Sequence, residues 1–324
     1  MNVSLIVLGV ALAAALVAFS ISASRTIALD PIDPATQERA LIRSLWRHPK
    51  VRRFLRERFD RKSAGGFLLS ISFIVVFAVS LVIGSVLDMI DTHQGLARLD
   101  KSVAAWGSHH TSSQAVDVLR WITQLGSTTF VVVALVLVGL YDYVRFRNRD
   151  VLLFLAVVGG GELLLSNALK WMVGRERPDV LRLVPASGSS FPSGHTTAAA
   201  ACAAAVALIL SRGRHRRTRA LCASLATLVA VAVATSRALL GVHWLTDVVA
   251  GLALGWGWFL LVAVLFGGRL QRLGDPVVRA SAAAPSTDPT AESVTQRLAN
   301  ANPGEPVSSS PARRSREMTD PRRI

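Results

Sequence analysis

Two histidines and an aspartate in the second half of the chain have the types and spacing needed for nucleophilic catalysis. His243 and Asp247 are four residues apart, so on a helix they share one face. A carboxylate can hold one imidazole nitrogen protonated and leave the other free to attack. His195 follows Ser193 and Gly194 at the start of an apolar run, where it is available as a general acid for a departing oxygen. The pattern therefore predicts nucleophilic chemistry at His243.

Basic side chains near these residues favour phosphate as the group that is bound. Lys170 ends one apolar run, Arg177 comes seven residues later, and Arg237 ends another run. Lys and Arg make charge-assisted hydrogen bonds, and the Arg guanidinium can bind two phosphate oxygens at once. The Ser193-Gly194 stretch opens a helix, whose free N–H groups and positive dipole end attract an anion. We therefore expect a phosphate site where these segments meet.

Membrane helices must hold these residues, because the apolar residues of the chain are abundant and clustered. Hydrophobic residues make up 51% of the 324 positions, which is high for a soluble domain of this size. Seven apolar runs approach the roughly 20 residues that a helix needs to cross a bilayer. None alternates polar and apolar residues as a barrel strand does. The runs are 3–21, 67–89, 128–144, 151–172, 196–210, 220–240 and 244–266. We therefore predict an all-α, polytopic membrane helix bundle.

The net charge of +15 would suggest a nucleic-acid partner in a soluble protein, but here it predicts membrane orientation. Clusters of Lys and Arg occupy four connecting segments: 25–63, 145–149, 211–219 and 269–279. The positive-inside rule makes these segments cytoplasmic. The segments that carry the histidines, 173–195 and 237–243, then lie outside, as does 91–127. We expect a multi-pass protein of the cell membrane with an extracytoplasmic site and no nucleic-acid partner.

Four regions are expected along the chain. Residues 1–24 form a transmembrane helix that is retained, with its N-terminus outside, because no basic residue precedes the apolar run. Residues 25–63 are a basic cytoplasmic linker, either an amphipathic helix on the inner leaflet or a plain connecting segment. Residues 64–268 form a six-helix core. Residues 269–324 are rich in Ala, Pro, Ser and Arg and are expected to be a disordered cytoplasmic tail.

Three motifs carry a family resemblance. They are Lys170-x6-Arg177-Pro178, Pro192-Ser193-Gly194-His195 and Ser236-Arg237-x5-His243-x3-Asp247. Their order and spacing resemble the signature of the type 2 phosphatidic acid phosphatase superfamily, with no departure inside the motifs. That superfamily includes lipid phosphatases, polyprenyl diphosphate phosphatases, glucose-6-phosphatases and vanadium haloperoxidases. The resemblance covers roughly 64–268, the six-helix core.

The resemblance implies a membrane phosphatase that hydrolyses a lipid phosphate or a polyprenyl diphosphate, such as undecaprenyl diphosphate. His243 would form a phosphohistidine, Asp247 would orient it, and His195 would protonate the leaving group. The implied phosphate ligands are Lys170, Arg177, Arg237, Ser193 and Gly194. No metal or other cofactor is implied, since three cations can neutralise the phosphate oxygens.

Two other functions compete with this one. A non-catalytic protein that binds or transports lipid phosphates could keep the fold, but the intact His243 and Asp247 argue against it. A vanadate-dependent peroxidase could bind vanadate with the same basic residues, but seven membrane spans argue against that reaction. The sequence leaves open which lipid is the substrate, and whether it carries one phosphate or two.

Several other polar residues have simpler interpretations. Arg175, Glu176 and Arg182 are interpreted as solvated loop charges rather than ligands of phosphate. Asp247 could also cap a helix, which we take as the weaker interpretation of that residue.

Residues inside the apolar runs are interpreted as packing residues. Glu162, Ser166 and Lys170 recur every four residues, and such a polar stripe should face the interior of the bundle. Cys202 and Cys222 are interpreted as small apolar packing residues.

Overall fold

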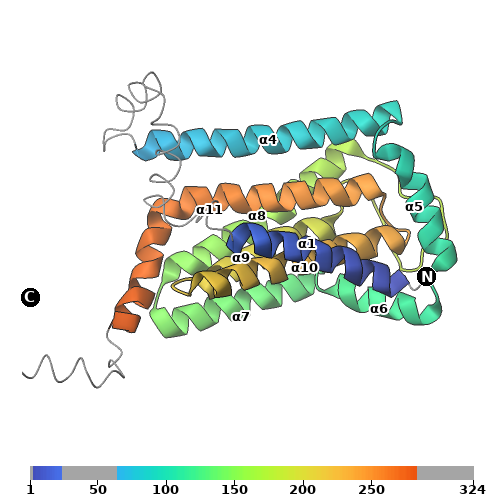
Figure 1. Cartoon of the computed structure of the whole chain (residues 1–324). Coiled ribbons are helices and arrows are strands. Elements are labelled where there is room, and N and C mark those ends of the chain that lie inside the picture. Colours follow the sequence, from blue (N-terminus) through green and yellow to red (C-terminus); the bar gives the residue numbers. More distant parts are fainter. Residues whose placement is uncertain (1–2, 24–63, 283–324) are drawn as a thin grey trace, which may run out of the picture. The chain divides into compact units, whose positions relative to one another are not determined.

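The computed structural model describes residues 3–23 and 64–282 of the chain. Within these ranges the regular elements are nine helices, without strands, as Figure 1 shows. The helices are α1 (Val3–Ala23), α4 (Ala64–Thr92), α5 (Ala97–His110), α6 (Ser113–Gln124), α7 (Thr128–Phe146), α8 (Arg149–Val173), α9 (Gly194–Ser211), α10 (Arg216–Leu239) and α11 (Leu245–Ala282). The predicted all-α class is confirmed.

Seven of these helices are long and apolar enough to cross a membrane: α1, α4, α7, α8, α9, α10 and α11. Each corresponds to one of the predicted apolar runs, so the prediction of a polytopic bundle is confirmed. Polar residues end the runs. Ser127 accepts a hydrogen bond from Phe130 N at the start of α7, and Asn148 accepts one from Asp150 N at the start of α8, as N-cap residues do.

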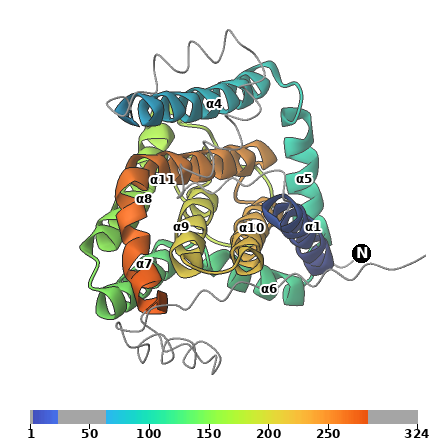
Figure 2. The same ribbon diagram turned by 60° about the vertical axis from the view of Figure 1, so that its left-hand side comes forward.

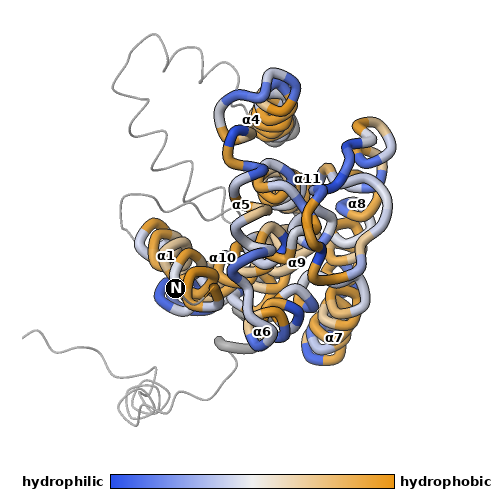
Figure 3. The backbone as a smooth tube through the Cα atoms, turned by 90° about the vertical axis from the view of Figure 1, so that its right-hand side faces the viewer, coloured by the Kyte–Doolittle hydropathy of each residue, from blue (hydrophilic) through white to orange (hydrophobic). Residues whose placement is uncertain are grey.

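The membrane-spanning helices alternate in direction, so their connecting links gather at two ends of the bundle. The two ends differ in their residues. The link between α7 and α8 and the link between α9 and α10, both rich in arginine, lie at one end. The opposite end carries α5, α6 and the links 174–193 and 240–244. Figure 3 views this opposite end, where hydrophilic stretches gather around the apolar helices. We call it the motif end, because all three sequence motifs reach it.

The segment 91–127 was predicted only as an external connection, but it contains helices α5 and α6. Both are too short to span a bilayer, and so no apolar run marked them. Ser112 caps α6 by accepting a hydrogen bond from Ala115 N. One face of α6, with Val116 and Leu119, is buried against the bundle. The spacing of these apolar residues is the signal that could have revealed this helix.

The centre of the bundle is formed by α9 and α10, with α1, α6, α7, α8 and α11 around them, as Figure 2 shows. Two glycines let the backbone of α11 approach α9 closely. A Cβ atom on Gly255 would lie 2.5 Å from Thr197 O, and one on Gly251 would lie 3.0 Å from Ser193 O. Small residues permit such approaches between membrane helices. This contact fixes the start of α9 beside the start of α11.

Helix α1 packs along α10. Val3 and Val7 are buried in a cluster with Leu239 and Val242 at the motif end. Its other side exposes large apolar residues such as Leu16, which suits contact with lipid. The extra N-terminal helix is therefore an integral part of the bundle.

Asp142 of α7 and Arg212, just after α9, form a buried ion pair at the arginine-rich end. Both are buried, with 2% and 7% of their surfaces exposed. The prediction counted Arg212 only among the basic residues that orient the protein. The structure shows that this arginine also ties the α9–α10 link to α7.

Glu162 and Ser166 are buried on α8, so the prediction that their stripe faces the bundle interior is confirmed. Cys202 is buried, Cys222 is half-buried, and neither forms a disulfide. Helix α11 continues to Ala282, past position 268 where the core was expected to end. The predictions for the linker 25–63 and for most of the tail fall on residues 24–63 and 283–324, which lie outside the described residues.

Candidate active site

The three motifs meet at the motif end of the bundle. Lys170 lies in the last turn of α8, Arg237 in the last turn of α10, and Asp247 in the first turn of α11. The side chain of His195, at the start of α9, is close enough to interact electrostatically with His243, Lys170, Arg177 and Arg237. A Cβ atom on Gly194 would lie 3.1 Å from Lys170 Nζ. All eight residues predicted for the site are therefore brought together.

His243 lies in the link between α10 and α11 and is 2% exposed. Its Nδ1 lies 2.8 Å from the carbonyl oxygen of Ser190, and its Nε2 lies 3.3 Å from Arg177 Nη1. A carbonyl only accepts hydrogen bonds, so we assign the proton to Nδ1 and the lone pair to Nε2. This is the tautomer that a nucleophilic histidine needs.

The surroundings of His243 also keep its ring uncharged. Burial is the largest effect; together with the positive charges of Arg237 and Arg177 it lowers the pKa of His243 to about 4, against the opposing effect of Asp247. At neutral pH the imidazole is therefore neutral, and Nε2 carries a lone pair that faces Arg177 Nη1.

Asp247 orients His243 less directly than the sequence suggested. Its Oδ2 lies 3.7 Å from His243 Nδ1, which is longer than a hydrogen bond. Asp247 Oδ2 accepts hydrogen bonds from Trp244 N and from the hydroxyl of Ser190. Since Trp244 immediately precedes α11, the first of these bonds caps the helix. The interpretation of Asp247 as a cap, taken as the weaker one, is therefore also correct.

Ser190 connects the two residues. Its hydroxyl donates to Asp247, and its carbonyl accepts from His243. The carboxylate therefore holds the serine that holds the histidine. Ser190 carries no spacing or charge that could have marked it in the sequence.

Arg175 was interpreted as a solvated loop charge, and this prediction is wrong. Its side chain is 15% exposed and forms ion pairs with Asp247 at 2.6 Å and with Asp100 at 2.8 Å. Gly174 ends α8 in a left-handed conformation with φ of +60°, and Arg175 follows it into the bundle. Asp100 is 75 residues away on α5, so no local pattern joins the two residues.

Arg177 uses its donors mainly to hold backbone. Its guanidinium donates hydrogen bonds to the carbonyls of Ser187, Gly188 and Val242 at 2.7–3.0 Å. These bonds join the 174–193 link to the 240–244 link. The Nη1 that donates to Val242 O also lies beside Nε2 of His243. The guanidinium of Arg177 is therefore not free in this structure to bind two phosphate oxygens at once, as the sequence predicted for an arginine at this site.

Arg237 has more free donor capacity. The residue is 6% exposed, and its Nη1 donates to Thr123 Oγ1 of α6 at 3.4 Å. Its Nε is buried and has no hydrogen-bond partner among the described residues. A buried donor without a partner is rare in proteins, and an anionic oxygen would satisfy it.

The start of α9 offers further donors. Ser193 occupies the N-cap position without capping the helix with its side chain. Its hydroxyl instead accepts a hydrogen bond from Thr196 Oγ1 at 2.9 Å. The first N–H groups of α9 are therefore left for another acceptor, at the helix end where an anion is favoured. Among the described residues, no cluster of three or more His, Cys, Asp or Glu side chains could hold a metal ion.

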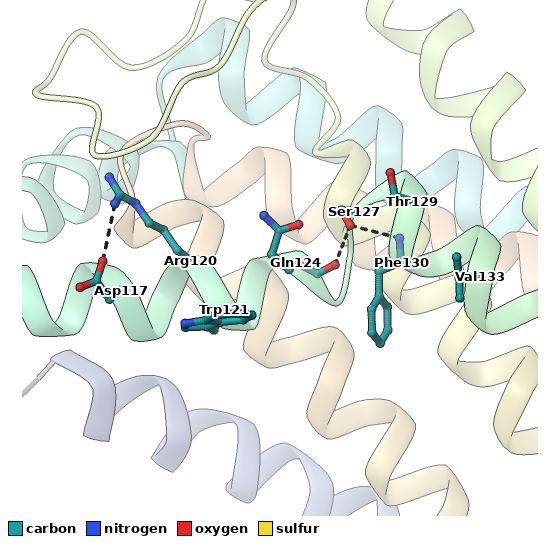
Figure 4. Close-up of a pocket in the computed structure, with 8 residues that line it drawn as sticks. All are labelled: Asp117, Arg120, Trp121, Gln124, Ser127, Thr129, Phe130 and Val133. Atoms are coloured by element: carbon teal, nitrogen blue, oxygen red, sulfur yellow. Dashed lines mark hydrogen bonds and ion pairs between the residues drawn. The ribbon is translucent and has the colours of Figure 1, made fainter.

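A pocket of about 770 Å³ lies beside the site, between the end of α6 and the start of α7, as Figure 4 shows. It is lined by Asp117, Arg120, Trp121, Gln124, Ser127, Thr129, Phe130 and Val133. The segment 123–127 separates it from Arg237 and His195. Thr123 contacts Arg237, and a Cβ atom on Gly126 would lie 2.5 Å from His195 O.

The seven apolar helices and this cluster of basic residues and histidines are those of a polytopic membrane protein with a candidate phosphate site. The model of the PAP2 superfamily matches residues 149–270, which include all three motifs. Phosphatidylglycerophosphatase B of Bacillus subtilis is 36% identical over 148 residues, covering 45% of this chain and 72% of that protein. The chain therefore belongs to the PAP2 superfamily.

Further comparisons agree with this assignment. The lipid A 1-phosphatase of Rhizobium etli is 40% identical over 125 residues, which cover 35% of this chain and 49% of that protein. This chain thus spans about half the length of that relative. The crystal structure of a transmembrane PAP2 type phosphatidylglycerolphosphate phosphatase from Bacillus subtilis has 29% identity and a TM-score of 0.52, covering 59% of this chain and 93% of that one. These relatives are membrane lipid phosphatases, which supports phosphatase activity in this protein.

Proposed function

We propose that this protein is a lipid phosphate phosphatase that works through a phosphohistidine on His243. One observation carries the proposal. The imidazole of His243 is buried, its Nδ1 is held by Ser190 O, and its Nε2 lies beside Arg177 among cations. A buried neutral imidazole with a fixed tautomer among basic groups is suited to attack a phosphoryl group.

The phosphate binds between Lys170, Arg237 and the first N–H groups of α9. Arg237 Nε gains the acceptor that it lacks within the described residues. Arg177 Nη1 turns from Nε2 of His243 to a phosphate oxygen, which frees the lone pair of the nucleophile. Binding and activation of the nucleophile are thereby coupled in one movement.

Two transfers complete the reaction. Nε2 of His243 forms a bond to phosphorus while the bond to the leaving oxygen breaks, and His195 gives that oxygen its proton. Water then attacks the phosphohistidine, and His195 takes a proton from the water. Inorganic phosphate leaves, and His243 regains its lone pair. The cations stabilise the charge on the equatorial oxygens during both steps without a metal.

The pocket between α6 and α7 supports a lipid as the substrate. Trp121 is 78% exposed there, and Phe130 and Val133 are about half exposed. An apolar tail can rest against these side chains while the headgroup lies beyond the segment 123–127. The names of the relatives favour a phosphate monoester on a glycerophospholipid or on lipid A, and a polyprenyl diphosphate is the other substrate class.

The charge distribution supports an extracytoplasmic site in the cell membrane. The arginine-rich links lie at the end of the bundle opposite His243, and such links face the cytoplasm. Cysteine variants at two exposed positions, Ser187→Cys and Arg214→Cys, test this in a background with Cys202 and Cys222 replaced by serine. A membrane-impermeant maleimide should label only position 187 in intact cells. Labelling of position 214 alone would reverse the orientation.

The activity test uses the purified full chain in detergent with a chelator present. Phosphate release is measured from phosphatidylglycerophosphate, phosphatidic acid, lipid A and undecaprenyl diphosphate, with His243→Ala as the control. We expect release from at least one lipid, and a trapped phosphoenzyme that is labile in acid and stable in base. Release no faster than that of His243→Ala across the panel would refute the proposal. Binding without release would indicate a non-catalytic protein.

A further inference from the structure

We propose that Arg175 and Asp100 form a positioning pair that sets the charge and orientation of Asp247, and through it the reactivity of His243. The inference rests on the proposed role of His243 as nucleophile. Arg175 stands at an unspecified position of the first motif, and Asp100 lies outside the region 149–270 that matches the family. The pair therefore adds a helix, α5, to the machinery of the site.

The contacts of Arg175 divide its guanidinium between two carboxylates. Nη1 donates to Asp247 Oδ1 at 2.6 Å, and Nη2 donates to Asp100 Oδ2 at 2.8 Å. The guanidinium also lies over the ring of Trp244, 5.4 Å from its centroid. Trp244 is the residue whose backbone N–H donates to Asp247. The arginine is thus held from several sides in one orientation.

Asp100 is anchored as firmly as its partner. It is 3% exposed, and it accepts hydrogen bonds from Thr246 N at 2.9 Å and from Thr246 Oγ1 at 2.6 Å. Arg175 Nη1 also donates to Thr246 Oγ1 at 2.7 Å. Asp100 therefore holds both the arginine and the first turn of α11, which carries Asp247. Such a closed network positions its members more strictly than a single ion pair does.

This arrangement has an electrostatic consequence for His243. The groups that face the imidazole are Asp247 from α11, Arg237 from α10, Arg177 from the 174–193 link and His195 from α9. Asp247 favours the protonated ring, and the two arginines oppose it. Arg175 partly neutralises the negative charge of Asp247. It therefore weakens the effect by which Asp247 favours the protonated form of His243.

The two members of the pair should consequently act in opposite directions. Removing the positive charge of Arg175 leaves Asp247 less neutralised, so the pKa of His243 rises. Without the negative charge of Asp100, Arg175 neutralises Asp247 more completely. Asp247 then favours the protonated ring less, so the pKa of His243 falls. A pair that served only to hold the fold would not produce shifts of opposite sign.

The test measures kcat and KM against pH for Arg175→Met, Arg175→Lys and Asp100→Asn, with a short-chain, water-soluble lipid phosphate as substrate. Lys101→Met is the matched control, because it removes an exposed charge next to Asp100 on the same helix. The acid limb of the profile is the pH range in which kcat/KM falls as pH is lowered. For Arg175→Met we expect this limb to shift to higher pH by about one unit. We also expect kcat to fall at least about tenfold while KM changes little.

Asp100→Asn should move the acid limb to lower pH. Arg175→Lys keeps the positive charge, so its acid limb should lie close to that of the unchanged protein. Lys101→Met should not move the acid limb. Shifts in the same direction for the two charge removals, or no shift in either, would overturn the proposal. If Arg175→Met does not fold, the shift to lower pH expected for Asp100→Asn decides the sign on its own. Loss of activity in His243→Ala tests the proposed function separately, because that result does not depend on the acid limb.

Discussion

Two buried arginines at opposite ends of the bundle have opposite surroundings. Arg212 pairs with the buried carboxylate of Asp142 between helices. Arg237 is equally buried, but within the described residues it forms no ion pair, and its Nε has no hydrogen-bond partner. A buried charge must be compensated. The compensating charge of Arg212 is therefore part of the protein, and the unpartnered Nε of Arg237 supports the proposal that its compensating charge arrives with the substrate.

Replacing Arg212 should have the largest effect, and it should be an effect on stability. Arg212→Met leaves the buried Asp142 without this partner, which costs about 3–5 kcal/mol. The double variant Arg212→Met with Asp142→Leu should recover most of that loss. Thermal unfolding in detergent measures both. A single variant as stable as the unchanged protein would show that the pair contributes little.

Replacing Arg237 should instead affect catalysis. Arg237→Met removes a donor that stabilises phosphate charge, so kcat/KM should fall about 10²–10³-fold. The melting temperature should stay the same or rise, because a buried charge is removed. Phosphate release and unfolding of the same preparation provide the two measurements. A destabilised protein with normal kcat/KM would reverse the distinction between the two arginines.

The pH dependence sharpens the comparison further. Because the pKa of His243 is lowered from 6.5 to about 4, the imidazole is neutral above about pH 4. The contribution of His243 to kcat/KM should therefore persist at pH 5 and fall as pH drops through 4. The folded state also binds fewer protons here than the unfolded state, so His243 costs stability progressively as pH falls below about 6.5.

The same profile separates the two arginines. In Arg237→Met the acid limb should lie at higher pH, because a positive charge near His243 is lost. In Arg212→Met it should not move, since Arg212 lies at the other end of the bundle. If the acid limb lies at the same pH in the unchanged protein, Arg237→Met and Arg212→Met, then the charge of Arg237 does not affect the pKa of His243.

The smallest effect is expected in the pocket between α6 and α7. Trp121→Ser removes apolar surface against which a lipid tail can rest, so kcat/KM for a long-chain lipid phosphate should fall about tenfold. The value for a short-chain analogue should not change. Leu164→Ser, at an exposed position of α8 away from this pocket, is the control. Equal losses on both substrates would place the tail elsewhere.

The sequence predicted those features that depend on local signals. The spans were predictable because apolar runs of this length are typical of helices that cross a bilayer, and the motif residues were predictable because they lie at the ends of these runs. Helices α5 and α6 were missed because they are short and amphipathic. The ion pairs of Arg175 were missed because its charge and its position in a loop suggested exposure. Its partner Asp100 lies on α5, a helix that no apolar run marked. The indirect link from Asp247 to His243 through Ser190 depends on backbone atoms, which the identity of a residue does not specify.

The close approach of α11 to α9 has a consequence for judging other members of the superfamily. A methyl group added at Gly255 would meet the carbonyl of Thr197 at 2.5 Å, so the two helices would have to move apart. That movement would separate His195 from His243 although neither residue had changed. A homologue can therefore keep every signature residue and still be inactive, because the glycines behind the site set the distance between the residues within it.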